Sequence, residues 1–436
     1  MELYNLVSFC GIFVLLAFAW LLSADRRNIN WRVIGWGVGL QLIAALFIFI
    51  FPVGTKIFWF VNDVVVTVLD SATAGAKFVF GRLALPPGTT DESGQASLGF
   101  ILAFQALPTI IFFSALMSIL YFLKIMPWVV RGFAYIFTRL MRISGAESLS
   151  AASNIFVGVE SALTIKPYLD KMTRSELCTV LTAGMATVSS NVLAVYVFNL
   201  QQHFPAIAGH LVTASFLSAP AALAVSKIIL PEAEKPLTLG MTVEPYYEKE
   251  KNLFEAVITG ANSGVRLVIG IVALLMAVLG LVALFDLIFG YAGGGFNSLF
   301  GTHIDWSLKG LCGYLFYPFT LILGVPPQDA WTAAKIIGER TIVTELTAYQ
   351  DLNNVLAQGL LHSSRSPVII TYALCGFAHL ASVAIFVGGV AALAPARTRA
   401  LAQVGFRALL AATIACLLTA CVAGTFFSQN SLLLGR

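Results

Sequence analysis

Between residues 154 and 160 the chain reads Asn154-Ile155-Phe156-Val157-Gly158-Val159-Glu160, which places a carboxylate in an apolar run beside a glycine. A second acid, Glu345, stands in a similar setting within Thr341-Ile342-Val343-Thr344-Glu345-Leu346. An ionisable side chain at membrane depth is costly and usually faces the protein interior or a cavity. Two such buried acids, one in each half of the chain, predict a transport site made by two related halves.

The composition indicates the class of protein. Of 436 residues, 58% are hydrophobic and 11% are charged, whereas soluble domains carry about 25% charged residues. We therefore predict an all-α polytopic membrane protein that resides in the lipid bilayer. The small net charge of +4 gives no support for a nucleic-acid partner. The six cysteines lie in or beside apolar segments, which favours membrane-packed thiols over a disulfide framework.

Apolar stretches of about 20 residues, long enough to span a bilayer, recur along the chain. The predicted spans are Leu6–Leu22, Val33–Phe51, Leu98–Leu123, Leu177–Phe198, Ala206–Leu230, Val268–Phe289, Val368–Leu393 and Ala408–Phe427. Lys and Arg follow the first, third, fifth and seventh spans, while the loops at 86–97, 199–205 and 290–303 contain neither. This alternation predicts eight spans with both termini outside.

Two features near the N-terminus qualify this topology. The charged residues Asp25, Arg26 and Arg27 follow the first span instead of preceding it, so we expect a retained helix and not a signal peptide. A further apolar stretch, Ile57–Phe80, carries Asp63 and Asp70 and is interpreted as an interfacial helix.

Two regions are apolar but interrupted by glycine and proline. The first runs from about Phe133 to Tyr168 and the second from about Leu308 to Tyr349. Broken helices at matching places in two halves are expected of an inverted repeat around a midplane site. We predict two re-entrant helical hairpins, with two kinked ordinary helices plus interfacial segments as the alternative.

The sequence lacks several motifs that are typical of ATP-driven transporters and of metalloenzymes. No Gly-Lys pair occurs, so a P-loop is excluded and ATP is not the expected energy source. His-Glu-x-x-His, Asp-Asp and Cys-x-x-Cys are also missing, which removes the common metal sites of intramembrane enzymes. A secondary transporter driven by an ion gradient is the leading class, with no enzymatic activity and no cofactor.

The two acids each have a functional and a structural interpretation. Glu160 is expected to bind a polar solute or carry a proton, but it could instead pair with Lys166 or with backbone amides. Glu345 is expected to bind solute, and an ion pair with Arg340 is the rival interpretation.

Two polar clusters interrupt the predicted spans. His379 and Ser382 in the seventh span would share one face of a continuous helix, where they could bind solute or only satisfy packing. The run Thr187–Asn191 in the fourth span could join helices or line an ion path.

At these residues the chain resembles the concentrative nucleoside transporter family. The likeness runs nearly end to end. It is carried by Phe113–Leu116, Ala146–Ser148, Asn154–Gly158, Leu323–Pro326, Thr344–Tyr349, Ala373–Ala378 and Leu393–Pro395. The resemblance implies a homotrimer in the bacterial inner membrane that imports nucleosides by sodium or proton symport, with elevator-like motion of a transport domain.

The resemblance also divides the chain. Residues 1–130 would be N-terminal scaffold helices, and 131–230 the first half of the transport domain with one re-entrant hairpin. Residues 231–252 would be a cytoplasmic linker and 253–305 a scaffold helix. Residues 306–436 would be the second half of the transport domain, with the other hairpin and the last two helices.

Site residues follow by position in the matching motifs. The resemblance assigns nucleoside binding to Gly158, Val159, Glu160, Val192, Glu345, Phe377, His379 and Ser382. It assigns a sodium site to Asn154, Val157, Thr187 and Val188. Glu160 and Phe377 would bound the base, while Glu345, His379 and Ser382 would hold the sugar hydroxyls.

The chain departs from the family where the base is read. The family's first hairpin reads Gly-Gln-Thr/Ser-Glu, whereas Gly158-Val159-Glu160 is one residue shorter and lacks the amide and the hydroxyl. Thr344 and His379 stand where the family has Asn, and His379 makes proton coupling more plausible. A changed set of buried polar groups should change specificity. The alternatives are therefore a same-fold symporter for another polar metabolite and an intramembrane enzyme using Glu160 and Glu345.

Overall fold

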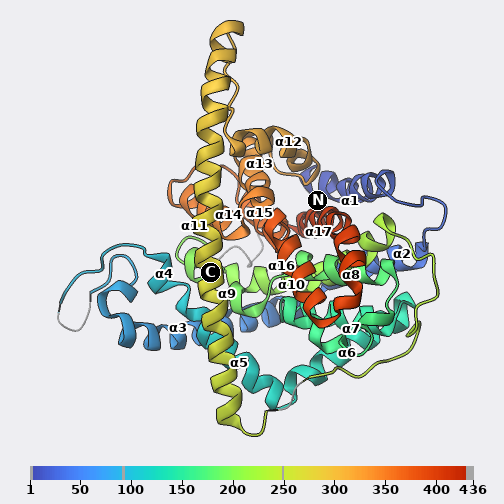
Figure 1. The fold of residues 1–436 in the computed structure, drawn as a ribbon. Helices are drawn as coiled ribbons and strands as arrows, with labels where there is room; N and C mark the ends of the chain where they lie inside the picture. The colour runs from blue at the N-terminus through green and yellow to red at the C-terminus, as the bar shows by residue number, and fades with distance from the viewer. Residues whose placement is uncertain (1–2, 91–93, 248–249, 429–436) are drawn as a thin grey trace.

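The computed structural model describes residues 3–90, 94–247 and 250–428 (Figure 1). Over those ranges the regular structure is helical, and the extended backbone forms only isolated bridges. The predicted all-α class is confirmed.

Eight helices in the described part of the chain are long and apolar enough to cross a membrane, as predicted in number. They are Leu3–Leu21, Trp31–Ile50, Pro52–Ala84, Leu102–Phe122, Arg174–Leu200, Ile207–Ile229, Leu253–Phe300 and Pro395–Phe426. The set differs from the predicted one in two members. Val368–Leu393 is wrong as a continuous span, because the helix breaks near its middle, and the predicted Leu177–Phe198, which stays in the set, is also broken, at residues 187–189. The stretch interpreted as interfacial is instead long and apolar enough to cross, so its placement along the membrane surface stays a prediction.

The N-terminal helices pack in two groups. Their bounds are α1 Leu3–Leu21, α2 Trp31–Ile50, α3 Pro52–Phe80, η1 Gly81–Ala84, α4 Leu102–Gln105 and α5 Pro108–Phe122. Asn30 caps α2, since its side chain accepts a hydrogen bond from Arg32 N at 3.2 Å. Helices α1 and α2 pack against α17 and α10, whereas α5 packs along α11.

The rest of the chain contains the same helical order twice. The first half comprises α6 Ile125–Met141, α7 Gly145–Asn154, η2 Val159–Ile165, η3 Leu169–Lys171, α8 Arg174–Ala186, α9 Ser190–Leu200 and α10 Ile207–Ile229. The second comprises α12 Leu308–Ile322, α13 Pro327–Ile342, α14 Glu345–Ala357, α15 Arg365–Leu374, α16 Leu380–Leu393, η4 Pro395–Arg397 and α17 Thr398–Phe426. Each half therefore has a lead helix, a broken hairpin, a broken crossing helix and an unbroken last helix, which agrees with the predicted repeat.

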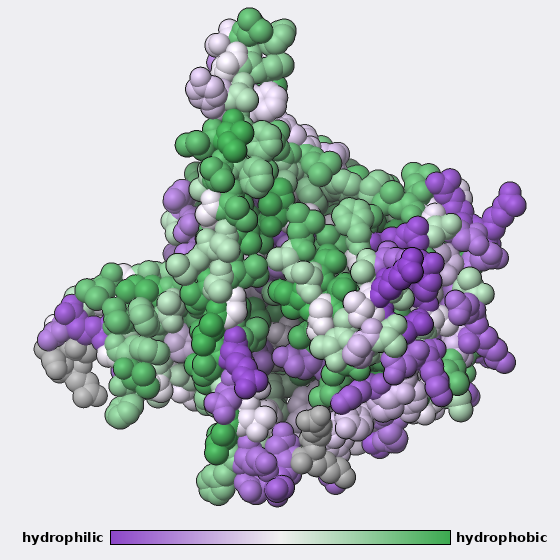
Figure 2. All heavy atoms as spheres, viewed as in Figure 1, coloured by the Kyte–Doolittle hydropathy of each residue, from purple (hydrophilic) through white to green (hydrophobic). Residues whose placement is uncertain are grey.

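Helix α11, Leu253–Phe300, separates the two halves in sequence. Its 48 residues correspond to about 72 Å at 1.5 Å per residue. In Figure 1 it runs the height of the molecule and extends beyond the body at one end. Figure 2 shows apolar side chains covering most of that projecting end, and Leu287 and Leu299 are 71% and 77% exposed. This apolar surface suits lipid or another protein chain.

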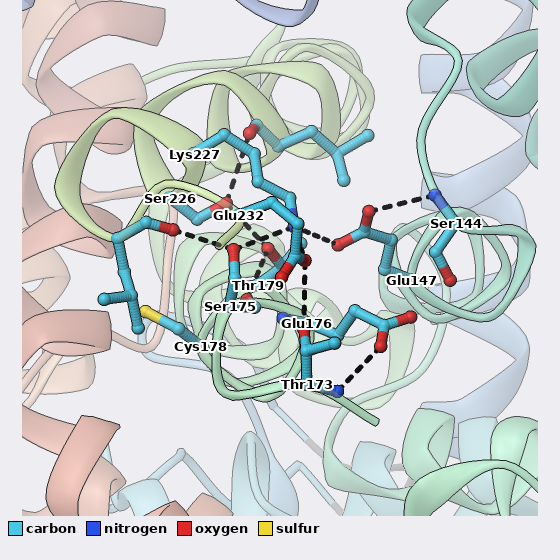
Figure 3. A network of polar contacts seen from close by, with 12 residues as sticks. Ser144, Glu147, Thr173, Ser175, Glu176, Cys178, Thr179, Ser226, Lys227 and Glu232 are labelled. Atoms are coloured by element: carbon cyan, nitrogen blue, oxygen red, sulfur yellow. Dashed lines mark hydrogen bonds and ion pairs between the residues drawn. The ribbon is translucent and has the colours of Figure 1, made fainter. Parts of the chain in front are cut away.

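A buried lysine ties the base of the first hairpin together (Figure 3). Lys227 of α10 lies 2.8 Å from Glu147 Oε2 and donates to Ser175 Oγ at 3.0 Å. Glu147 also accepts from Ser144 N, which closes a capping box at the start of α7. Ser175 lies in the first turn of α8, so one ammonium joins α7, α8 and α10.

A buried arginine has the corresponding place in the second half. Arg365, at the start of α15, donates to Gly324 O just before α13 at 2.9 Å. It donates to Gly424 O of α17 at 2.7 Å and to Asn5 Oδ1 of α1 at 2.6 Å. Each half thus has a buried cation where its hairpin begins. The cation comes from the last helix, α10, in the first half and from the crossing helix, α15, in the second.

The predicted linker, 231–252, lies against the first half and is hydrogen-bonded to it. Gly145 N donates to Thr238 O at 2.9 Å, and Gly240 N donates to Ile143 O at 3.1 Å. Farther along, Tyr246 N donates to Thr164 O in η2 at 2.8 Å. The described part of the linker therefore follows the hairpin closely.

Candidate functional site

Four helix breaks meet in the interior of the molecule. Two belong to the hairpins, at residues 155–158 and 343–344, and two to the crossing helices, at residues 187–189 and 375–379. Ser190 N donates to Phe156 O at 2.9 Å, which joins the two breaks of the first half. Cys416 Sγ lies 3.1 Å from Cys375 O and 3.7 Å from Ala186 O, which joins one break from each half. Broken helices free backbone groups that a solute or an ion can bind.

The break at residues 375–379 changes the geometry predicted for His379 and Ser382. They do not share the face of a continuous helix, because α15 ends at Leu374 and α16 begins at Leu380. His379 is the N-cap of α16: its Nδ1 accepts from Ser382 N at 3.2 Å, and Ser382 Oγ accepts from His379 N at 3.2 Å. The two side chains are close, but through a capping box.

Glu345 is the centre of a buried polar cluster. It is the first residue of α14, after the cap Thr344. Tyr196 Oη donates to Glu345 Oε1 at 2.5 Å, and His379 Nε2 lies 3.4 Å from Glu345 Oε2. Apart from that contact, neither His379 Nε2 nor Glu345 Oε2 has a polar partner within the described residues. The cluster therefore retains hydrogen-bonding capacity for hydroxyl groups of a solute.

The rival ion pairs predicted for the two acids are not formed. Arg340 Nη1 donates to Ala373 O at 2.6 Å, and no ion pair joins Arg340 to Glu345. Lys166 places its ammonium 5.7 Å from the ring centre of Tyr246, and no ion pair joins it to Glu160. All four side chains belong to the described part of the chain. Both acids are therefore available to a ligand.

A cavity of 360 Å³ lies beside this cluster. Predicted substrate residues Gly158, Val159, Glu160, Val192 and Phe377 line it. Glu160 was predicted to be buried, but it is exposed to this space. Glu345, His379 and Ser382 are fully buried behind the wall, and Tyr196 connects them to it because it lines the cavity.

A second cavity of 260 Å³ adjoins the first. Glu160, Asn191 and Leu267 line both, so they mark the boundary between the two spaces. The second cavity is also lined by Val157, by Tyr246 of the linker and by residues of α5 and α11.

The residues assigned to sodium lie at the first-half breaks. Asn154 Oδ1 is buried and has no hydrogen-bond partner among the described residues. Ser215 Oγ donates to Ile155 O at 2.8 Å and lies 3.4 Å from Val188 O, so it holds the two breaks side by side. Thr187 and Val188 line the first cavity and Val157 the second. An orphaned amide oxygen near freed carbonyls fits a hard cation that prefers oxygen ligands.

Sequence reasoning missed three residues that the fold brings to this region, Tyr196, Ser215 and Arg266, whereas Asn191 belongs to the polar run predicted to join helices or line an ion path. Tyr196 follows Val192 by one helical turn, so the spacing could have indicated it. Arg266, a cation within a very apolar helix, lines the first cavity from α11. Ser215 carries no signal in the sequence, because its contacts with residues 155 and 188 are tertiary.

Comparison with known proteins gives three matches to family models. Residues 10–83 match the N-terminus and residues 210–424 the C-terminus of the Na⁺-dependent nucleoside transporters. Residues 103–202 match a model described as nucleoside recognition.

Relatives match along nearly the whole chain. Solute carrier family 28 member 3 of Mus musculus is 39% identical over 434 residues, which are 96% of this chain and 58% of that protein. The chain thus spans little more than half of that relative. An uncharacterized transporter of Haemophilus influenzae is 35% identical over 430 residues, which are 98% of this chain and 99% of that protein.

Solved structures share the fold. CNTnw in an inward-facing, substrate-bound state superposes with a TM-score of 0.86 at 33% identity, covering 97% of this chain and 98% of that one. A CNTnw variant in an outward-facing state gives 0.87 at 32% identity, with 98% of each chain covered.

Proposed function

Because this chain belongs to the concentrative nucleoside transporter family, a family of transporters and not of enzymes, we propose that it imports nucleosides by sodium symport. The observation that supports this most is the Glu345 cluster. A carboxylate held by Tyr196 and beside His379 lies behind the wall of a 360 Å³ cavity that Tyr196 itself lines, where four helix breaks meet. A polar solute can bind there without contact with lipid.

The predicted site residues are part of this proposal. Glu345, His379 and Ser382, which lie behind the wall that Tyr196 completes, bind the sugar hydroxyls, because a carboxylate accepts hydrogen bonds from two adjacent hydroxyls. Phe377, Val192 and Gly158–Glu160 bound the base in the cavity. Sodium binds at Asn154, Val157, Thr187 and Val188, for which the orphaned Asn154 Oδ1 is the support.

An elevator motion is proposed for the transport step. Helices α5 and α11 pack on each other, and α11 faces both halves across the cavity. This packing supports a scaffold that includes 253–305 and a transport domain of 131–230 and 306–436, joined by the linker 231–252. Helices α1 and α2 of the predicted scaffold, 1–130, pack against α17 and α10 of the two halves.

We further propose a homotrimer in the inner membrane with both termini outside. The exposed apolar surface of α11 supports the assembly, since only five of its 48 residues are buried within the protomer. Cross-linking in native membranes should yield a trimer, and a monomer or dimer would contradict it.

The first experiment measures uptake of radiolabelled uridine and adenosine into proteoliposomes, with sodium and proton gradients imposed separately. Uptake with the sodium gradient alone is expected. Uptake with only the proton gradient would replace sodium by protons in the proposal. No nucleoside uptake from a folded trimer would favour a different metabolite, read by the shortened segment Gly158-Val159-Glu160.

Replacement of the central acid tests the site. Glu345→Gln should abolish nucleoside uptake and leave assembly intact, because it removes the charge that binds the hydroxyls and keeps the side-chain shape. Uptake and size-exclusion profiles are compared with those of Glu234→Gln, an exposed acid outside the site. Full activity of the Glu345 variant would contradict the assignment.

A further inference from the structure

One end of the 360 Å³ cavity has polar groups that the proposed sugar site does not use. They are Glu160 from the first hairpin, Asn191 from α9 and Arg266 from α11. Glu160 and Asn191 lie where the two cavities adjoin, together with Leu267, the neighbour of Arg266. Glu160 and Asn191 therefore mark this boundary, Arg266 lines the same cavity from the residue next to Leu267, and Tyr196 marks the Glu345 cluster.

These groups are available to a ligand. Asn191 Oδ1 is buried and has no hydrogen-bond partner among the residues described. The side chains of Glu160 and Arg266, both described and both exposed to the cavity, form no ion pair with each other. Charged groups that line a cavity inside a membrane protein are functional candidates by default.

The donors and acceptors are arranged by type. A carboxylate and an amide oxygen accept hydrogen bonds, whereas a guanidinium only donates them. A base that satisfies this end must present adjacent donors to Glu160 and Asn191 and acceptors to Arg266. Guanine presents N1–H and N2–H₂ as adjacent donors, with O6 and N7 as acceptors that arginine binds in a fork. Adenine places the acceptor N1 against the carboxylate, and uracil flanks its single N–H with two carbonyls.

We propose that this end of the cavity reads a 6-oxopurine base and that Arg266 is a specificity-determining residue. This rests on the proposed nucleoside transport and names its preferred substrate as guanosine. The walls agree with a planar base, because Phe377, Val192 and Ile271 line the same cavity with apolar side chains. The first hairpin lacks the Gln amide that reads the base in the family. Glu160 of that hairpin and Asn191 of α9 take over this role.

The test is competition for uridine uptake in proteoliposomes. Guanosine should compete about tenfold or more better than adenosine and cytidine, as expected for one good paired hydrogen-bond contact. The analogue 1-methylguanosine, which lacks the N1–H, should lose this advantage. Glu160→Gln should reverse the order of guanosine and adenosine, because an amide can both donate and accept.

Arg266 is tested by the ratio of guanosine to uridine affinity. Arg266→Gln and Arg266→Lys should both lower this ratio, since neither retains the fork of donors. Arg399→Gln, at an exposed position near the start of α17, is the matched control and should leave the ratio unchanged.

The outcomes separate the two proposals. Nucleoside uptake with adenosine or uridine preferred by the wild type overturns the base-reading proposal and leaves the proposed function in place. If the Arg266 variants lose affinity equally for every nucleoside, the base-reading proposal is also overturned. An arginine that only fixes the orientation of α11 in the membrane would act in that way. Uptake of no nucleoside refutes the proposed function itself.

Discussion

At the scale of single residues, Tyr196 decides how the buried acid is presented. Its ring stacks on Tyr349 with 4.4 Å between the ring centres, and its hydroxyl donates to Glu345 Oε1 at 2.5 Å. The stacking fixes the ring, and the hydrogen bond fixes one carboxylate oxygen. The other oxygen, beside His379, is left for a solute. Tyr196 therefore acts as a positioning residue for Glu345.

Tyr196→Phe keeps the stacked ring and removes only the hydroxyl. Hydrogen bonds to charged groups contribute about 1.5–3 kcal/mol, so the KM for uridine should rise about tenfold or more, with a smaller change in maximal rate. Uptake kinetics measure both parameters. Tyr372→Phe, another fully buried tyrosine whose hydroxyl contacts His210, is the control. An unchanged KM in the Tyr196 variant would show that Glu345 needs no such support.

At the scale of elements, the break between α15 and α16 depends on one glycine. Gly376 has φ of 153°, a conformation that residues with a side chain rarely adopt. A Cβ there would lie 2.9 Å from Ala186 O and closer still to Cys416 Sγ. The two broken crossing helices therefore approach each other through this position, and His379 follows directly as the cap of α16.

Gly376→Ala should displace residues 375–379 and strongly reduce uptake, because the added methyl meets backbone from α8 as well as strain in its own conformation. Gly388→Ala in α16 is the matched control, since a Cβ at that position meets nothing within 4 Å. Uptake normalised to folded protein distinguishes the two. Normal transport by the Gly376 variant would mean that the break tolerates a shift.

At the scale of the whole molecule, buried cations hold each half as one body. Lys227 joins three helices of the first half and Arg365 joins α15, α17 and α1 around the second. Glu147, which pairs with Lys227, is as buried as the lysine itself. Removal of one partner from such a pair leaves an uncompensated charge.

Lys227→Met should destabilise the protein by about 3–5 kcal/mol, the usual effect of breaking a buried ion pair. The double variant Lys227→Met with Glu147→Gln should recover part of this loss, because the orphaned carboxylate is neutralised. Thermal unfolding in detergent measures both, with the exposed Lys235→Met as control. Equal stability of the single and double variants would contradict the pairing.

The sequence by itself determined the class of protein and the positions of the two hairpins. Low charge and apolar runs of about 20 residues indicate membrane-spanning helices, which satisfy their own backbone polar groups inside lipid. Glycines, prolines and isolated acids then mark the hairpins, because each is costly in an uninterrupted membrane helix. Glu160 and Glu345 can be identified in this way from the amino-acid sequence alone.

Only the tertiary structure decided which polar groups meet. Tyr196 and Glu345 are 149 residues apart, and Ser215 and Ile155 are 60 apart. Local sequence patterns cannot predict such pairs. The pairs arise when helices pack, and the apolar surface of a helix does not specify which residues of its neighbour it will contact. The same reason explains why Arg340 pairs with backbone and not with nearby Glu345. The sequence indicates where the hairpins lie, and the packing of the two halves brings their helix breaks together into one candidate site.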